Sequence, residues 1–254
     1  MTELYTGIVR TYYDKEETKI HEEYFQLNGK KNGIYKKYLS VYDPNDKISI
    51  IYLEQEINYI DDKKNGIYKK YHRNGKLETE ANYIDDKLNG IYKNYWKNGW
   101  DYLQINPMRE NLLKTNFLGQ LMIEVNYILD KKNGILKSYH PNGQLHDEVN
   151  YINDKKNGIY KRYWNNGLLL EELYYINDTI QGIYKKYYSN GILESESDYF
   201  NWMLNGICRT YYENSVLKEE ANYILNKKNG ICRTYYENGE LKEEANYIDD
   251  KICL

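Results

Sequence analysis

Few residues in the chain have types and spacings that could do chemistry: four histidines, three cysteines and a recurring glutamate. A histidine or cysteine metal site needs ligands at short, recurring intervals, and no such interval occurs. His72 and His140 occupy a position that is aromatic in most other copies of the repeat described below, so packing explains them better than catalysis does. His21 and His146 are isolated in the sequence. We therefore expect no metal site.

The cysteines also give no indication of a reactive site. Cys208 and Cys232 occupy the same position in successive copies of the repeat. In stacked hairpins that position recurs at every second strand, about 9.6 Å apart, whereas a disulfide needs Cα atoms within about 7 Å. They are predicted to be free thiols, as in a reducing compartment, and Cys253 is incidental.

The recurring glutamate could be mistaken for half of a catalytic carboxylate pair. Because every clear copy carries an acid near this position, we interpret it as a structural partner of neighbouring basic residues and tyrosines. The sequence also has no nucleophile elbow, phosphate-binding loop or dinucleotide-binding glycine motif. These observations predict a protein that is not an enzyme, with no catalytic residue and no cofactor.

The amino-acid composition narrows the classes of protein to which the chain could belong. The 32 tyrosines stand against 3 phenylalanines, and mean hydropathy is -0.89, so the core is expected to be thin and rich in tyrosine. A net charge of -3, from 35 basic and 38 acidic residues, argues against a nucleic-acid-binding protein. No apolar run is long enough to cross a membrane, and the first residues do not read as a secretory signal. We expect a cytoplasmic protein, either of a low-GC bacterium or, if viral, of the host cell.

The sequence repeats itself with a period of 24 residues. A Gly-Ile pair opens each copy, a basic residue follows three positions after the glycine, and tyrosine follows five positions after it. The copies begin near Gly7, Gly33, Gly66, Gly90, Gly134, Gly158, Gly182, Gly206 and Gly230, with a degenerate copy near Leu112. Insertions at 39–47 and 100–118 interrupt the period. We predict one repeat domain spanning 1–254.

Each copy reads as two short strands. In the third copy, residues 67–72 are rich in isoleucine and tyrosine, and residues 76–84 alternate apolar and polar side chains. Asn74-Gly75 between them is a strong hairpin signal, and Asp85-Asp86 supplies the return turn. The sequence predicts an all-β fold: an elongated antiparallel meander of stacked β-hairpins, about ten repeats and roughly twenty strands, forming a solenoid-like twisted sheet.

The hairpin loop decides which face is buried, and the sequence leaves two registers open. A two-residue type I′ loop would pair Lys69 with Glu80 and put His72 beside Leu77. A three-residue loop with Gly75 in a G1 bulge shifts the register by one residue and exchanges the faces. We favour the bulged register. It would place Ile67, Tyr71, Leu77, Ala81 and Tyr83 on one face, set Lys70 against Glu78 and Lys186 against Glu194, and set Thr210 and Thr234 against Lys218 and Lys242.

Units such as "NGIYKKYHRNGKLETEANYIDDKLNG" and "NGICRTYYENGELKEEANYIDDK" resemble the MORN repeat variant of the YwqK-type antitoxin proteins. The likeness runs from Gly7 to Lys251. It implies an antitoxin or immunity protein that binds a partner toxin. Related MORN repeats serve as membrane-apposed scaffolds in eukaryotes, and many-copy versions occur in giant viruses. This chain has fewer glycines than the classical MORN pattern and lacks its tryptophan column, so the lipid-scaffold implication carries over poorly.

These observations favour a non-catalytic protein-binding repeat protein whose partner, by resemblance, is a toxin. The alternative is a structural or assembly scaffold, for example of a large DNA virus, that self-associates through its sheet surface or edge strands. A specific partner is most easily read where the repeat is broken, because the insertions carry residue types common at binding hot spots. The candidate partner-binding residues are Tyr42, Pro44, Trp100, Tyr102, Met108 and Arg109.

Overall fold

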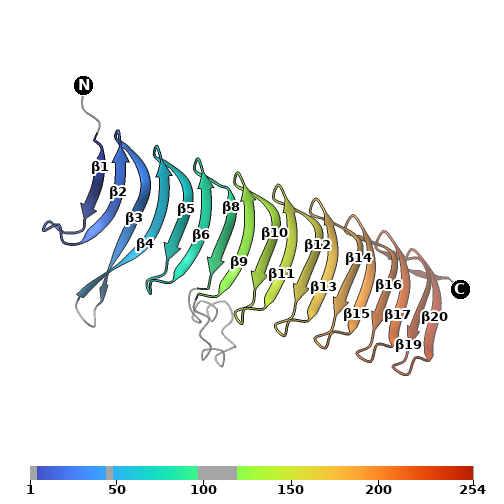
Figure 1. Cartoon of the computed structure of the whole chain (residues 1–254). Helices are drawn as coiled ribbons and strands as arrows, with labels where there is room; N and C mark the ends of the chain where they lie inside the picture. The colour runs from blue at the N-terminus through green and yellow to red at the C-terminus, as the bar shows by residue number, and fades with distance from the viewer. Residues whose placement is uncertain (1–4, 44–47, 97–118, 254) are drawn as a thin grey trace. The chain divides into compact units, whose positions relative to one another are not determined.

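Each of the nine clear copies of the repeat folds as a β-hairpin, with a first strand that follows or contains its Gly-Ile pair and a second strand paired to it (Figure 1). The computed structural model describes residues 5–43, 48–96 and 119–253. These residues form 21 β-strands and no helix, which confirms the predicted all-β class. The chain divides into two units, residues 1–132 and 133–254, and each is described by itself.

In the first unit, every strand pairs antiparallel with its neighbour in the sequence, so the unit is a meander. Its strands are β1 (Gly7–Tyr12), β2 (Ile20–Leu27), β3 (Lys30–Asp43), β4 (Ile48–Ile60), β5 (Lys63–Tyr71), β6 (Leu77–Ile84), β7 (Lys87–Leu88), β8 (Gly90–Tyr95) and β9 (Leu121–Ile128). The hairpin of β3 and β4 is longer than the others, because pairing continues past Tyr38 to Asp43 opposite Ile48. This extension coincides with the first insertion, at 39–47.

The second unit repeats the same antiparallel pairing. Its strands are β10 (Lys131–Tyr139), β11 (Leu145–Ile152), β12 (Lys155–Tyr163), β13 (Leu169–Ile176), β14 (Thr179–Tyr187), β15 (Leu193–Phe200), β16 (Met203–Tyr211), β17 (Leu217–Ile224), β18 (Lys227–Lys228), β19 (Gly230–Tyr235), β20 (Leu241–Ile248) and β21 (Lys251–Cys253).

Two-residue turns join successive hairpins. Asp85 and Asp86 have φ angles of 47° and 68°, the left-handed pair that defines a type I′ turn. The second turn residue also binds the preceding hairpin: the Lys64 backbone N–H donates to Asp86 Oδ1 at 2.8 Å, and the Asp86 N–H donates to the Lys64 carbonyl at 3.0 Å. Aspartate and asparagine suit this position because they tolerate the left-handed region and supply the acceptor.

Three-residue loops close the other end of the hairpins. In the hairpin of β5 and β6, the Gly75 N–H donates to the His72 carbonyl and the His72 N–H donates to the Lys76 carbonyl, each at 2.8 Å. Gly75 has a φ of 78°, so this is the G1-bulged loop that the Asn-Gly pair predicts.

The register of the strand bodies differs from the favoured prediction. Lys69 lies opposite Glu80 and Tyr71 lies opposite Leu77, with a second irregularity between Lys70 and Tyr71 that shifts the register back by one residue. The extra residue is Glu78. The expected common face is therefore wrong: Ala81 and Tyr83 share a face with Tyr68, while Ile67, Tyr71 and Leu77 lie on the other. Likewise Thr210 and Thr234 lie opposite Glu219 and Glu243, not Lys218 and Lys242.

The charge pairs predicted at the same place are nevertheless present. Lys70 Nζ lies 2.6 Å from Glu78 Oε1, and Lys186 Nζ lies 2.8 Å from Glu194 Oε1. The second bulge turns Glu78 and Thr79 to the same side of the sheet, so the lysine reaches the bulged glutamate although it is paired with Thr79.

The core lies on one face, which we call the tyrosine face. It carries a central column of small or apolar residues in the second strands, flanked by tyrosines from both strands of each hairpin. The buried apolar side chains among the described residues all lie there: Tyr35, Ile57, Ala81, Val125, Leu136, Val149, Tyr160, Leu173, Tyr175, Ala221 and Cys232. Within a hairpin the tyrosine rings pack edge to face, as Tyr68 and Tyr83 do at 5.9 Å between centroids.

Candidate binding surface

The opposite face, which we call the isoleucine face, carries a column of half-exposed isoleucines, one from the first strand of each hairpin. Their exposed fractions lie between 47% and 59%. The first unit contributes Ile8, Ile34, Ile67 and Ile91, and the second contributes Ile135, Ile159, Ile183, Ile207 and Ile231. A branched apolar side chain is expected to be buried, so a regular exposed column indicates a surface available for contact.

The backbone conformation explains why glycine precedes each isoleucine. Gly66 has a φ of 105°, and a Cβ atom there would lie 2.9 Å from the Asn58 amide nitrogen of the adjacent strand. That amide donates a hydrogen bond of 2.8 Å to the Asn65 carbonyl. The Gly-Ile pair and the asparagine of the preceding strand therefore form one local arrangement, which the repeat reproduces at Asn150 and Asn222.

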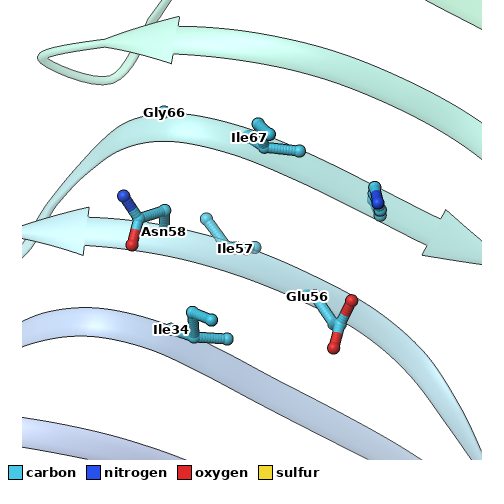
Figure 2. A pocket seen from close by; sticks show the side chains of 7 residues that line it. Ile34, Glu56, Ile57, Asn58, Gly66 and Ile67 are labelled. Atoms are coloured by element: carbon cyan, nitrogen blue, oxygen red, sulfur yellow. The ribbon is translucent and has the colours of Figure 1, made fainter.

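A hollow lies between neighbouring isoleucines, over the asparagine. In the first unit Ile34 and Ile67 flank Asn58, and the hollow of about 410 Å³ is also lined by Glu56 and Lys69. Figure 2 shows both isoleucines on the strands to either side of the one that carries Asn58 and Glu56.

The second unit has the same hollow, of about 280 Å³. Ile135 and Ile159 flank Asn150, with Glu148 and Lys161 at one side. Every lining residue is the repeat equivalent of one in the first unit, so the hollow is a property of the repeat. Its floor and walls combine two branched aliphatic groups, an amide, a lysine and a glutamate.

Charged side chains of alternating sign run beside the isoleucines. Each basic residue lies two positions after an isoleucine on the same strand, and each acid lies on the neighbouring strand. Lys161 Nζ is 3.3 Å from Glu172, and Arg209 reaches both Glu196 and Glu220, at 3.2 and 2.7 Å. The predicted structural role of the glutamates is confirmed at these positions. Tyr71 adds a hydrogen bond of 2.9 Å to Glu56, and burial followed by this bond raises the pKa of Tyr71 to about 12.

The tyrosine face holds a polar cluster centred on Asp147. Its carboxylate accepts hydrogen bonds from Tyr160 Oη and Arg162 Nε, both at 2.7 Å, and lies 3.0 Å from His146 Nδ1. Burial alone would raise the pKa of Asp147, but the hydrogen bonds from His146, Arg162 and Tyr160 outweigh it and hold that pKa well below its ordinary value. Because Arg162 also contacts Glu171 at 3.3 Å, the cluster links adjacent hairpins.

The histidines have structural surroundings. His140 Nε2 lies 3.0 Å from the Tyr163 carbonyl, the same link to the next hairpin that Trp164 and Tyr188 make at their own positions. His72 is buried beside Glu78. The two histidines that are isolated in the sequence lie beside aromatic rings, His21 near Tyr13 and His146 near His140. Among the described residues no cluster of histidine, cysteine, aspartate or glutamate could hold a metal ion.

The cysteines are free, as predicted. Cys232 is buried on the tyrosine face, 3.6 Å from both Lys228 Nζ and Glu219 Oε1. Burial raises the pKa of its thiol, so it is a packing residue and not an activated nucleophile.

The residues predicted to bind a partner are mostly outside the described part of the chain. The backbone of Tyr42 lies in β3 opposite Ser49. Pro44, Trp100, Tyr102, Met108 and Arg109 lie outside the described residues, as does the degenerate copy near Leu112. Sequence reasoning missed the isoleucine face, since it assigned Ile67 to the core. One sequence feature could have indicated the isoleucine face: the Gly-Ile pair, whose isoleucine is kept in all nine clear copies.

Comparison with known families agrees with this geometry. The MORN repeat variant matches residues 64–85, 132–153, 156–177, 180–201, 204–224 and 228–249, together just over half of the chain. The chain belongs to this family. Each match covers both strands of one hairpin.

Three of the nine clear MORN repeat copies, at Gly7, Gly33 and Gly90, lie outside the matched segments. The copies at Gly33 and Gly90 are the two that contain the insertions. No curated protein matches the chain. Within the part of the chain that the structure describes, no helix is long and apolar enough to span a membrane.

Proposed function

We propose that this MORN repeat variant protein is a non-catalytic binding protein that holds another protein on its isoleucine face. The observation that carries the proposal is the column of half-exposed isoleucines and the hollows between them. Soluble monomers rarely expose contiguous apolar patches larger than a few hundred Å², and larger ones mark interaction sites.

The charges of this face favour a protein over a polyanion. Bases and acids alternate along the column and are largely paired with each other, as Arg233 is with Glu244 at 2.7 Å. A nucleic acid or an anionic membrane would need an excess of unpaired bases. A partner protein with an apolar strip and charges of both signs could bind the isoleucine face without leaving charges unpaired.

The finer proposal is that the partner is a toxin, which this chain neutralises by covering it. Its support is the resemblance of the repeat units to the YwqK-type antitoxin proteins. The test is to express the gene next to this one, alone and together with the chain. If the product of the neighbouring gene arrests growth and this chain relieves the arrest, the antitoxin role is supported. If that product is harmless when expressed alone, the antitoxin role is contradicted.

The alternative is an assembly scaffold, and an open strand edge favours it. Within the described residues β1 pairs only with β2, so its outer edge keeps unpaired backbone groups. Such an edge is a template for another strand.

The role of the face can be tested with matched variants. Ile159→Lys with Ile207→Lys adds two charges to the column, and Leu168→Lys with Leu225→Lys adds them at a loop and a turn, where both leucines are also exposed. Partner capture by the full chain should be lost in the first variant and kept in the second. Capture by both would show that binding uses another surface, and the insertions at 39–47 and 100–118 would then be replaced by short Asn-Gly loops.

A further inference from the structure

The isoleucine face of the second unit has more exposed apolar surface than a monomer ordinarily leaves in water. Besides the isoleucine column, the last residue of each second strand lies on this face, two positions after the residue that lies opposite the isoleucine of the same hairpin. These residues are also about half exposed: Ile152, Ile176, Phe200, Ile224 and Ile248. At roughly 90 Å² each, the ten side chains present on the order of 900 Å². One partner in a stable complex buries about 800 Å², whereas the largest patch on a typical monomer is about 300–600 Å².

The second unit is also a single layer. Its strands pair only with sequence neighbours, and the core residues all lie on the tyrosine face. A sheet with apolar side chains on both faces is ordinarily covered by a second layer about 10 Å away. The described residues of this unit supply none for the isoleucine face.

The face is complementary to itself. First strands carry isoleucine and a base, as Ile159 and Lys161 do. Every second strand carries a glutamate, such as Glu148, and two positions after it an asparagine in three strands (residues 150, 222 and 246) and Tyr174 or Asp198 in the other two. Rotating a copy by half a turn about an axis parallel to the strands keeps each column opposite the same column and reverses the strand order. With the axis between two adjacent strands, every first strand faces a second strand of the other copy.

With the axis in this position, the two copies match both in charge and in shape. Each base meets an acid of the other copy, and each isoleucine meets the position that asparagine occupies in three of the five second strands. The asparagine is the floor of the hollow between two isoleucines, as Asn150 is between Ile135 and Ile159. Where that residue is asparagine, an isoleucine of one copy therefore enters a hollow of the other, and like charges are kept apart along the whole face.

We propose that the partner of the isoleucine face is a second copy of this chain, so that two second units pack face to face as a two-layer sheet with antiparallel strand order. This rests on the proposed binding role of the face and identifies its occupant. It favours the scaffold role over the antitoxin role, because the dimer occupies the face that a toxin would need.

The first experiment measures the mass of the full chain by sedimentation and light scattering from about 0.5 to 100 μM. The wild-type chain is expected to dimerise. Ile159→Lys with Ile207→Lys should raise the dissociation constant about a hundredfold or more, because four lysines would enter one apolar interface. Leu168→Lys with Leu225→Lys should leave it unchanged, and circular dichroism should be the same for all three proteins.

A second measurement locates the interface without adding charge. In the Ile183→Cys variant, alkylation of the new thiol is followed by mass spectrometry of its peptide, at a dimeric and at a dilute concentration. Alkylation should be at least about tenfold slower in the dimer. The same comparison for Leu168→Cys should show no difference.

Two outcomes overturn the proposal. A wild-type chain that stays monomeric at 100 μM has no second copy on the face, yet its capture of an unrelated protein through the isoleucines would leave the proposed binding function intact. A dimer that survives both isoleucine-to-lysine changes, or that leaves alkylation at residue 183 unaffected, uses a different surface, such as the β1 edge.

Discussion

At the scale of single residues, the polar cluster around Asp147 shows how a single-layer sheet compensates for a thin core. The carboxylate is mostly buried, with 18% of its side chain exposed, and it receives hydrogen bonds from Tyr160 and Arg162 of β12, the first strand of the next hairpin. Buried carboxylates are tolerated only when they are paired in this way, and removal of one partner leaves the others unsatisfied. The cluster therefore ties hairpins together at a point where apolar packing is sparse.

The Asp147 cluster should make stability depend on pH. Because the pKa of Asp147 is lower in the folded chain than in the unfolded one, the carboxylate stabilises the fold above about pH 4 and the contribution is lost as pH falls toward the folded value. Asp147→Asn should lower the free energy of unfolding at pH 7 by about 1–3 kcal/mol and flatten its fall between pH 5 and pH 3. Urea unfolding at several pH values measures both effects.

Tyr160→Phe is the graded control for this prediction. It removes one hydrogen bond and keeps the ring, so it should reduce the pH dependence only in part. An Asp147→Asn chain with the same acid dependence as the wild type would show that other carboxylates dominate.

At the scale of the hairpin, the glycine of the Gly-Ile pair should be costly to replace in proportion to the space around it. At Gly206, with a φ of 132°, an added Cβ would lie 2.9 Å from Asp198 Cβ. At Gly182, with a φ of 76°, nothing lies within 4 Å of an added Cβ. Alanine at Gly182 should cost about 1–2 kcal/mol from backbone strain, and alanine at Gly206 should cost more because Asp198 must move. Thermal unfolding of the two variants tests this, and equal losses would contradict it.

The turns between hairpins offer a second test at this scale. Asp178 combines a φ of 67° with an acceptor oxygen for the Lys156 N–H at 2.8 Å. Asp178→Gly keeps the backbone conformation and loses the acceptor, and should cost about 0.5–1.5 kcal/mol. Asp178→Ala loses both and should cost about 1 kcal/mol more. If the two variants melted together, backbone strain would contribute nothing at this turn.

The hairpins also show what the sequence can and cannot predict. Asn-Gly and Asp-Asp pairs act through local backbone preference, so the loop types and the meander follow from a single unit. The second bulge at Glu78 has no local signature, because "KLETE" contains neither glycine nor proline. One extra residue exchanges the two faces, so the prediction placed Ile67 in the core and missed the exposed column. The isoleucine face could not be predicted without this bulge.

At the scale of the whole molecule, each hairpin is stabilised by its neighbours, and stability grows with the number of copies. The second unit contains five complete Gly-Ile copies whose strands pair in sequence order. Its buried apolar residues, from Leu136 to Cys232, all lie on these strands. This organisation predicts that residues 131–254 fold without the rest of the chain.

The fragment of residues 131–254 should give a β-sheet circular dichroism spectrum and a cooperative melting transition. A second fragment, of residues 143–254, begins after β10 and leaves Val149 and Tyr151 of β11 without their partners Leu136 and Gly134. It should melt at a lower temperature, because an edge hairpin has lost half of its pairing while the hairpins beyond it are intact. If the longer fragment were unfolded, folding would not be local to the repeats, and the nearest-neighbour account of this sheet would be wrong. If the two fragments melted together, the pairing of β10 with β11 would contribute little to the stability of the unit.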